Sequence, residues 1–217
     1  MPHAAPTKRA RSADQKLERR QAILSAADAH LHEVGFEAFS MGSLAKAVGL
    51  AKGTLYLYFR TREEVFLALS EAKIDHWATA ITRSLEAGMT DEAFCEAFFR
   101  TACEDVSLLP MLMRLNAIIE HNVSIEALVV AKRALRNRLD HLAAAVADTL
   151  GLSITQAMEA LGALAPLLIG AAQSDQGPTL EAETLPDDVR EFIHSFDAYR
   201  TFVPNARRII RGIRAGE

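Results

Sequence analysis

The sequence predicts an all-α fold, and three observations support this prediction. Half of the 217 residues are apolar, enough for a substantial core, while aromatic residues make up only 6%. Ala and Leu are abundant and favour helices, whereas strands prefer β-branched and aromatic side chains. Apolar residues recur at helical spacing, and no stretch alternates with the period of a strand.

The N-terminal end is expected to be a basic arm followed by a first helix. Residues 1–11 are rich in Pro, Ala and Lys/Arg without periodicity, so they form either a flexible arm that reaches DNA or an inert solvated tail. The first helix is expected to begin with a capping box of Ser12 and Gln15. Gly35 follows its last periodic apolar residue and is expected to end it.

Three further helices are expected before a long C-terminal part. Ser40 is a plausible N-cap for a short helix that Gly49 ends, and a third helix is expected at 52–59. The spacing of Thr61 and Glu64 indicates a second capping box, which opens a helix that continues to about residue 87. This fourth helix would join the basic segment to the rest of the chain without a loose linker.

The remainder is also expected to be helical. The approximate ranges are 90–106, 108–121, 124–150, 154–174 and 187–202, with a last helix to about 214. Helix ends are expected near Gly88, Pro110, Gly151 and Pro204, and a polar loop is expected at 175–186.

Charge is distributed unevenly along the chain. Residues 1–62 hold ten Lys/Arg and five Asp/Glu, a net +5, whereas residues 63–217 hold fourteen and twenty-three, a net −9. The overall charge of −4 alone would argue against nucleic acid. The asymmetry instead favours a chain whose N-terminal end meets phosphates while the rest is repelled from them.

Two short helices separated by a tight glycine-containing turn form a helix-turn-helix. The motif stretches are Gly35–Met41 (GFEAFSM), Leu44–Phe59 (LAKAVGLAKGTLYLYF) and Thr61–Glu64 (TREE). They closely resemble the DNA-binding domain of the TetR family of bacterial transcriptional regulators, over roughly residues 12–75. The resemblance implies a helix-turn-helix domain at 12–62 and a helical effector-binding and dimerisation domain at 63–217.

Cations, hydroxyls and one thymine-contacting side chain make up the DNA contacts that the resemblance implies. Lys52 offers a cation to a phosphate or a guanine edge, and Gly53 would let the backbone approach the duplex closely. Tyr58 would reach a phosphate or pack against the first helix. The full set is Ser40, Met41, Lys46, Lys52, Gly53, Thr54, Tyr56, Leu57, Tyr58 and Arg62.

Several positions depart from the usual pattern of the family. Ala51 replaces a frequent Ser, so a helix cap and a phosphate-binding hydroxyl are lost. Gly42 and Ser43 replace a polar or charged pair, which removes the capping-box acid and one base contact. Leu57 stands where a His or aromatic residue is frequent, and would contact a thymine methyl instead. These changes affect the expected operator sequence rather than DNA binding itself.

The larger domain is expected to dimerise and to bind a small hydrophobic or amphipathic effector. The expected dimer surface is small and apolar, or else ordinary intrachain core: Leu161, Gly162, Ala165, Leu168, Ile169 and Ala172. The candidate effector residues are Trp77, Phe94, Phe98, Met111, Met113, Asn116 and His121. The resemblance implies a repressor that binds a palindromic operator as a homodimer and is released by the effector.

Other functions remain as alternatives. An enzyme is disfavoured because no GxSxG, HExxH, CxxC or Rossmann pattern occurs, and neither a cofactor nor a metal is expected. A constitutive DNA-binding or architectural protein without effector, and a helical adaptor for another protein, are further alternatives. We expect neither a membrane span nor a secretory signal, and therefore a cytoplasmic bacterial protein that is nucleoid-associated when bound.

Overall fold

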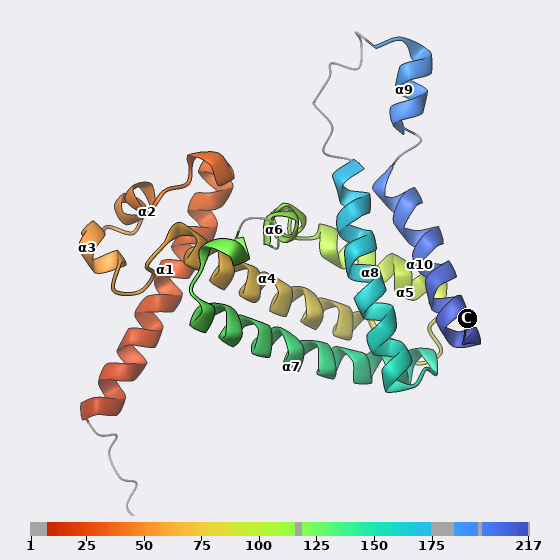
Figure 1. The fold of residues 1–217 in the computed structure, drawn as a ribbon, viewed down its shortest axis with the longest axis horizontal. Helices are drawn as coiled ribbons and strands as arrows, with labels where there is room; N and C mark the ends of the chain where they lie inside the picture. Colours follow the sequence, from red (N-terminus) through yellow and green to blue (C-terminus); the bar gives the residue numbers. More distant parts are fainter. Residues whose placement is uncertain (1–7, 116–118, 175–184, 195–196, 217) are drawn as a thin grey trace, which may run out of the picture.

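The computed structural model describes residues 8–115, 119–174, 185–194 and 197–216 (Figure 1). The predicted all-α fold is confirmed, since every regular element in these ranges is a helix. A small group of N-terminal helices lies at one side, and the long helices α4 and α7 run from it toward a larger bundle (Figure 1). Two apolar cores correspond to these two parts of the molecule.

Helix α1 (Lys8–Ala38) begins earlier than the sequence predicts. The N-cap expected at Ser12 is wrong, because the helix already includes residues 8–11, and residues 1–7 of the expected arm lie outside the described ranges. Gly35 has φ 73° and ψ 173°, so the helical path is interrupted at the expected glycine. Ile23, Ala27 and Leu31 are buried on the face that packs on the other N-terminal helices.

Helix α2 (Met41–Ala47) has the expected N-cap, Ser40, but with an unexpected partner. Ser40 Oγ accepts from the Ser43 backbone N–H at 3.0 Å, and Ser43 Oγ accepts from the Ser40 backbone N–H at 3.0 Å. The Ser43 hydroxyl therefore accepts the hydrogen bond that an acidic side chain usually accepts, and the capping box is complete without a carboxylate.

Helix α3 (Lys52–Leu55) is shorter than the predicted 52–59. Ala51 stands at its N-cap without a side-chain hydrogen bond, as expected for an alanine. Beyond Leu55 the chain continues as a turn, in which Leu57 N donates to Thr54 O at 3.2 Å and Phe59 N donates to Leu55 O at 3.1 Å. The buried side chains of Leu55 and Phe59 hold this segment on the N-terminal core.

Gly49, in the turn between α2 and α3, has φ 64°. We expect Gly49→Ala to lower the free energy of unfolding by about 1–2 kcal/mol, because a Cβ is strained in the left-handed region. Gly53→Ala is the matched control, since Gly53 lies in α3 without a positive φ and an added Cβ would meet nothing within 4 Å. Urea unfolding followed by circular dichroism measures both, and equal losses would contradict this explanation.

Helix α4 (Arg62–Ser84) joins the two parts of the molecule. Thr61 Oγ1 accepts from Glu64 N at 3.1 Å, as predicted, but Glu64 Oε2 accepts from Arg60 N at 2.7 Å rather than from the cap itself. Val65, Phe66 and Leu69 are buried against the N-terminal helices, as expected. Further along, Trp77 and Ile81 enter the core of the larger domain.

The larger domain contains helices α5 (Asp91–Cys103), α6 (Leu108–Arg114), α7 (Ile125–Leu150), α8 (Ile154–Ser174), α9 (Asp187–His194) and α10 (Ala198–Ala215). A short 3-10 helix, η2, covers Glu120–Asn122. In place of the single α-helix predicted at 108–121, the described residues show α6 to Arg114, π-helical geometry at Leu115 and Ile119, and then η2. The helix predicted at 187–202 is wrong, because Asp197 caps a new helix by accepting from Arg200 N at 2.8 Å.

Helices α8 and α10 pack against each other. Each of them departs from the sequence prediction in one respect. Pro204 lies inside α10 rather than ending a helix, while buried Phe202, Val203 and Ala206 hold α10 in the core. In α8, the stretch Ile154–Gln173 is long and apolar enough to cross a membrane by composition alone, contrary to the sequence expectation. Its buried leucines pack in the core of this domain, which is also typical of a core helix in a soluble protein.

Candidate nucleic-acid interface

The helix-turn-helix presents an exposed surface around the start of α3. Lys46, Lys52 and Gly53 are exposed, as are Tyr56 and Leu57, whose exposed fractions are 42% and 72%. Lys52 Nζ lies 6.0 Å from the centre of the Tyr56 ring, so the cation and the phenol form one patch. These side chains are not required by the core, and they combine a charge, a hydroxyl and an apolar group suited to DNA.

The other predicted contact residues also serve the fold. Met41 is buried in the N-terminal core, and the Ser40 hydroxyl is occupied by the cap of α2. Thr54 and Tyr58 are half-buried. Arg62 donates to Glu63 Oε1 at 3.1 Å and to the carbonyl oxygen of Phe39 at 3.4 Å, so its guanidinium is held against the protein.

Arg60 is a basic residue at this surface that the sequence interpretation missed. It is exposed in the turn between α3 and α4, and its backbone N–H is fixed by Glu64. Its place in the short turn directly before the capping box of α4 is the sequence signal that would have found it, because turns mostly lie at the surface. Arg60 thus adds a cation beside the predicted contact residues.

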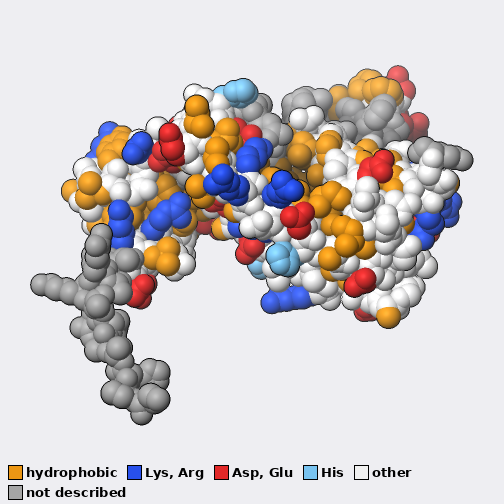
Figure 2. All heavy atoms as spheres, turned by 60° about the horizontal axis from the view of Figure 1, so that its bottom comes forward, with side chains coloured by type: hydrophobic (Ala, Val, Ile, Leu, Met, Phe, Trp, Pro, Cys, Tyr) orange, Lys and Arg blue, Asp and Glu red, His pale blue; other side chains and the backbone are white. Residues whose placement is uncertain are grey.

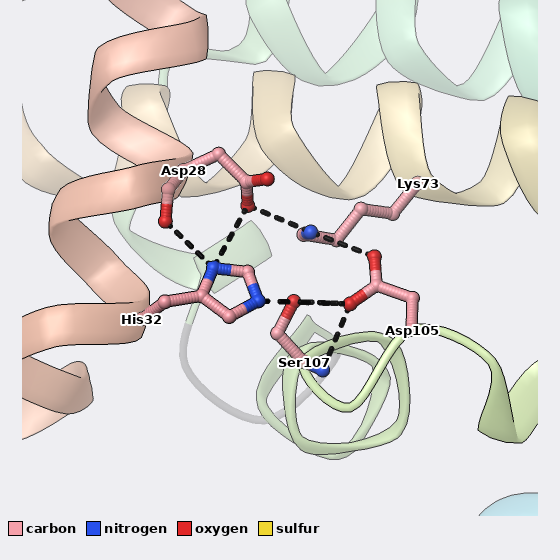
Figure 3. A network of polar contacts seen from close by, with 5 residues as sticks. All are labelled: Asp28, His32, Lys73, Asp105 and Ser107. Atoms are coloured by element: carbon pink, nitrogen blue, oxygen red, sulfur yellow. Dashed lines mark hydrogen bonds and ion pairs between the residues drawn. The ribbon is translucent and has the colours of Figure 1, made fainter.

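A buried lysine connects the N-terminal helices with the larger domain (Figure 3). Lys73 of α4 is only 7% exposed, and its Nζ lies 2.7 Å from Asp28 Oδ1 of α1 and 2.8 Å from Asp105 Oδ2 before α6. Asp105 also accepts from the Ser107 backbone N–H at 2.9 Å and from its hydroxyl at 2.7 Å. His32 Nε2 lies 4.0 Å from Asp105 Oδ1, which ties α1 to the same loop.

Electrostatics favours the ionised form of Asp105 in this cluster. Burial raises the pKa of Asp105, but the hydrogen bonds from Lys73 and Ser107 outweigh it and hold the pKa below its ordinary value. The lysine is therefore neutralised by two carboxylates from different elements. The cluster, which we call the Lys73 junction (Asp28, His32, Lys73, Asp105 and Ser107), contacts α1, α4 and the segment between α5 and α6.

Two of the predicted effector residues line an apolar cavity, and the others do not. The cavity has a volume of about 40 Å³ and is lined by Ile74, Trp77, Ala78, Phe98, Leu135, Arg138, Leu139, Leu142, Leu161 and Ala165. Trp77 Nε1 donates to Thr101 Oγ1 at 3.1 Å, which leaves its ring facing apolar neighbours. Phe94 is buried behind Phe98, with ring centres 5.9 Å apart.

The remaining effector candidates lie elsewhere. Met111 is buried in the N-terminal core, Met113 is half-buried, and His121 is exposed on η2. Asn116 lies outside the described residues. An open groove of about 390 Å³ between α4 and α7 adjoins the cavity, with which it shares Ala78, Arg138 and Leu142. The sequence interpretation did not include Arg138.

The six residues considered for dimerisation divide between two faces of α8. Three are buried in the chain's own core: Leu161, Leu168 and Ala172. The other three remain partly or fully accessible: Gly162, Ala165 and Ile169. Only 33% of the apolar stretch Ile154–Gln173 is buried inside the chain, so much of α8 has no intrachain cover.

The thiol of Cys95 is buried in the core of the larger domain. Burial, more than the nearby carboxylates, raises the pKa of the Cys95 thiol to about 12, so this cysteine is unreactive at neutral pH. Cys95 and Cys103 form no disulfide, in line with their spacing. Among the described residues, no three His, Cys, Asp or Glu side chains gather as a metal site would require.

Comparison with known proteins agrees with this arrangement. The family model described as "Bacterial regulatory proteins, tetR family" matches residues 23–69, and the "Tetracyclin repressor-like, C-terminal domain" model matches residues 71–217. A fatty acid metabolism regulator protein from Bacillus subtilis is 33% identical over 60 residues, which are 28% of this chain and 31% of that protein. The match therefore spans about a third of the relative's length.

The fold is shared with a solved structure whose TM-score exceeds 0.5. The TetR family transcriptional regulator PfmR from Thermus thermophilus aligns with a TM-score of 0.53 at 22% identity, covering 87% of this chain and 97% of that one. A TetR family regulator from Marinobacter aquaeolei aligns with a TM-score of 0.41 at 21% identity, covering 88% and 97%. The C-terminal family model alone spans more than half of the sequence, so the chain belongs to the TetR family of transcriptional regulators.

Proposed function

We propose that this protein is a ligand-responsive repressor that binds a palindromic operator as a homodimer and is released by a small-molecule effector. TetR family regulators bind DNA and act as dimers with small-molecule effectors. The observation that carries the proposal is the exposed patch of Lys52, Gly53, Tyr56 and Leu57 on a helix-turn-helix. In this role the protein works in the cytoplasm, on bacterial DNA.

Gly53 supports the DNA-binding role in particular. An added Cβ would meet nothing within 4 Å inside the chain, and the residue has no positive φ, so the fold itself does not require a glycine there. Close approach of the DNA backbone would explain the glycine at this position. A side chain at the start of a recognition helix would stand between the helix and the groove.

The uncovered face of α8 supports the dimer. A stretch of apolar helix that is mostly unburied is costly in water, and a second copy would cover it through accessible residues such as Gly162 and Ile169. A symmetric dimer would then present two recognition helices about 34–36 Å apart, one turn of DNA. An effector that favours another spacing weakens operator binding by no more than its differential affinity for the two states.

Removing the exposed patch should abolish selective DNA binding. We expect the Lys52→Ala/Tyr56→Ala variant to lose affinity for DNA from upstream of its own gene by about 10- to 100-fold, and to show a salt slope smaller by about 1. Fluorescence anisotropy across a salt series measures both, with Lys132→Ala on α7 as the charge-matched control. A folded double variant that binds like the wild type would refute the proposed interface.

A further inference from the structure

Arg138, on α7, has an unsatisfied donor at the edge of the apolar cavity. Its Nε donates to Asp75 Oδ1 of α4 at 2.7 Å, but its Nη1 is buried without a hydrogen-bond partner in the described structure. Leaving a charged donor unpaired costs more than the net worth of an ordinary hydrogen bond, so such groups are normally paired. The guanidinium is thus held in place by Asp75, and its buried Nη1 has no acceptor among the described residues.

Arg138 stands where two spaces of different character meet. On one side lies the enclosed cavity of about 40 Å³, in whose lining Arg138 is the only charged residue. On the other lies the open groove of about 390 Å³, whose walls include Arg83, Asn137 and His141. An apolar interior beside a polar opening suits a ligand with one apolar and one polar end.

The charges around the groove indicate which charge the polar end of the ligand carries. Arg83 and Arg138 outnumber Asp75, the only carboxylate in the lining, and His141 adds to them when protonated. Basic side chains are seen among apolar ones on the face that α7 presents (Figure 2). An anion is therefore favoured here, and a carboxylate matches the planar geometry of a guanidinium.

The cleft beside Lys73 is a less suitable anion site, although its volume of about 370 Å³ is similar. Lys73 already has two carboxylate partners, at 2.7 and 2.8 Å, so an incoming anion would have to displace one of them. At Arg138, by contrast, the vacant donor and the apolar space occur together.

We propose that the effector is a compact organic carboxylate that pairs with the guanidinium of Arg138 and whose apolar end enters the cavity beside Trp77. This inference rests on the proposed function and names the chemical class of its effector. Because Asp75 of α4 binds the same guanidinium through Nε, a second carboxylate would weaken the attraction between α7 and α4 without displacing Asp75. This ion pair is a direct route from the ligand to the helix that carries the DNA-binding domain.

The test compares octanoate with 1-octanol, which has the same chain without the charge. Trp77 is the only tryptophan, so its fluorescence reports on the cavity. We expect octanoate to change the fluorescence saturably and to bind at least about tenfold more tightly than octanol. Arg138→Gln should remove this preference, so that octanoate and octanol bind with similar affinity.

Two further variants serve as a control for the loss of charge and as a second test. Arg136→Gln, on the same helix with a side chain 83% exposed, should bind octanoate like the wild type. Asp75→Asn should tighten octanoate binding, which keeps the inference testable if Arg138→Gln does not fold. Equal binding of octanoate and octanol, no binding of either, or an unchanged preference in folded Arg138→Gln would overturn it.

The failure of this inference is distinguishable from failure of the proposed function. Operator binding is measured on the same preparation by anisotropy, without any ligand. Selective DNA binding with no octanoate preference rejects the carboxylate and leaves the repressor intact. Absence of DNA binding from folded protein rejects the proposed function, whatever octanoate does.

Discussion

Phe98→Ala is expected to lower the free energy of unfolding by about 3–5 kcal/mol, the usual range for a buried phenylalanine. Phe98 is 2% exposed and lies at the centre of an aromatic cluster. Its ring centre is 4.9 Å from that of Trp77 on α4 and 5.7 Å from that of Phe202 on α10. Truncation therefore removes contacts from three helices at once and enlarges an existing cavity.

The neighbouring phenylalanine provides the control for this prediction. Phe99 is half-buried and contacts Tyr199 and Phe202 at the edge of the same core, so Phe99→Ala should cost at least about 1 kcal/mol less. Urea unfolding followed by circular dichroism should be compared at one protein concentration, because the proposed dimer would make stability concentration-dependent. Equal losses for the two variants would show that Phe98 does not occupy the centre of the core.

Lys73→Met should lower the free energy of unfolding by about 2–3 kcal/mol, because it leaves two carboxylates close together without their cation. The estimate lies below the usual cost of breaking a fully buried pair, since Asp28 and Asp105 are 39% and 28% exposed. Lys132→Met is the control: its lysine is 48% exposed and pairs only with Glu120, so it should cost less than about 1 kcal/mol.

The Lys73 junction also predicts a dependence on pH. The pKa of Asp105 is lower in the folded chain than its ordinary value of 3.8, so its stabilising contribution is present above that value. The contribution is lost as the pH falls through the lowered pKa, because the carboxylate is then protonated. Acid unfolding of Lys73→Met should accordingly be less steep in this range than that of the wild type.

The Lys73 junction has a consequence for regulation as well. It holds α1 of the DNA-binding part to the segment before α6, through a helix that also lines the cavity. If Lys73→Met remains folded, effectors should change its operator affinity less than they change that of the wild type. A variant that is destabilised but fully responsive would assign the junction a structural role only.

The sequence was sufficient to predict most of the helices, because they depend on local patterns, whereas the DNA-contact residues stay a prediction. Apolar spacing and caps such as Ser40 and Thr61 act within a few residues. The errors arose where more than one local structure satisfies the same sequence pattern. Ser43 takes the place of an acidic residue in the capping box of α2. Asp197 begins a new helix inside a stretch whose apolar spacing is continuous. Propensity alone does not decide such cases.

The Lys73 junction and Arg138 were missed because their partners are distant in sequence. Lys73 pairs with residues 28 and 105, and Arg138 with residue 75, which no periodicity reveals. A signal was nevertheless present. Lys73 falls on the apolar stripe of α4 between Leu69 and Trp77, and a charge at an inward position requires a partner. We assign Lys73 to the coupling between the DNA-binding part and the larger domain, and Arg138 to ligand binding.

Selection of bound duplexes from random-sequence DNA, using the full chain without any ligand, tests the central claim most directly. The account predicts enrichment of an inverted repeat whose half-sites are centred about 10–10.5 base pairs apart, or a multiple of this, as a symmetric pair of recognition helices requires. The Lys52→Ala/Tyr56→Ala variant should enrich no sequence. Absence of any enriched sequence from folded wild-type dimer, or enrichment of a single asymmetric site, would contradict the account.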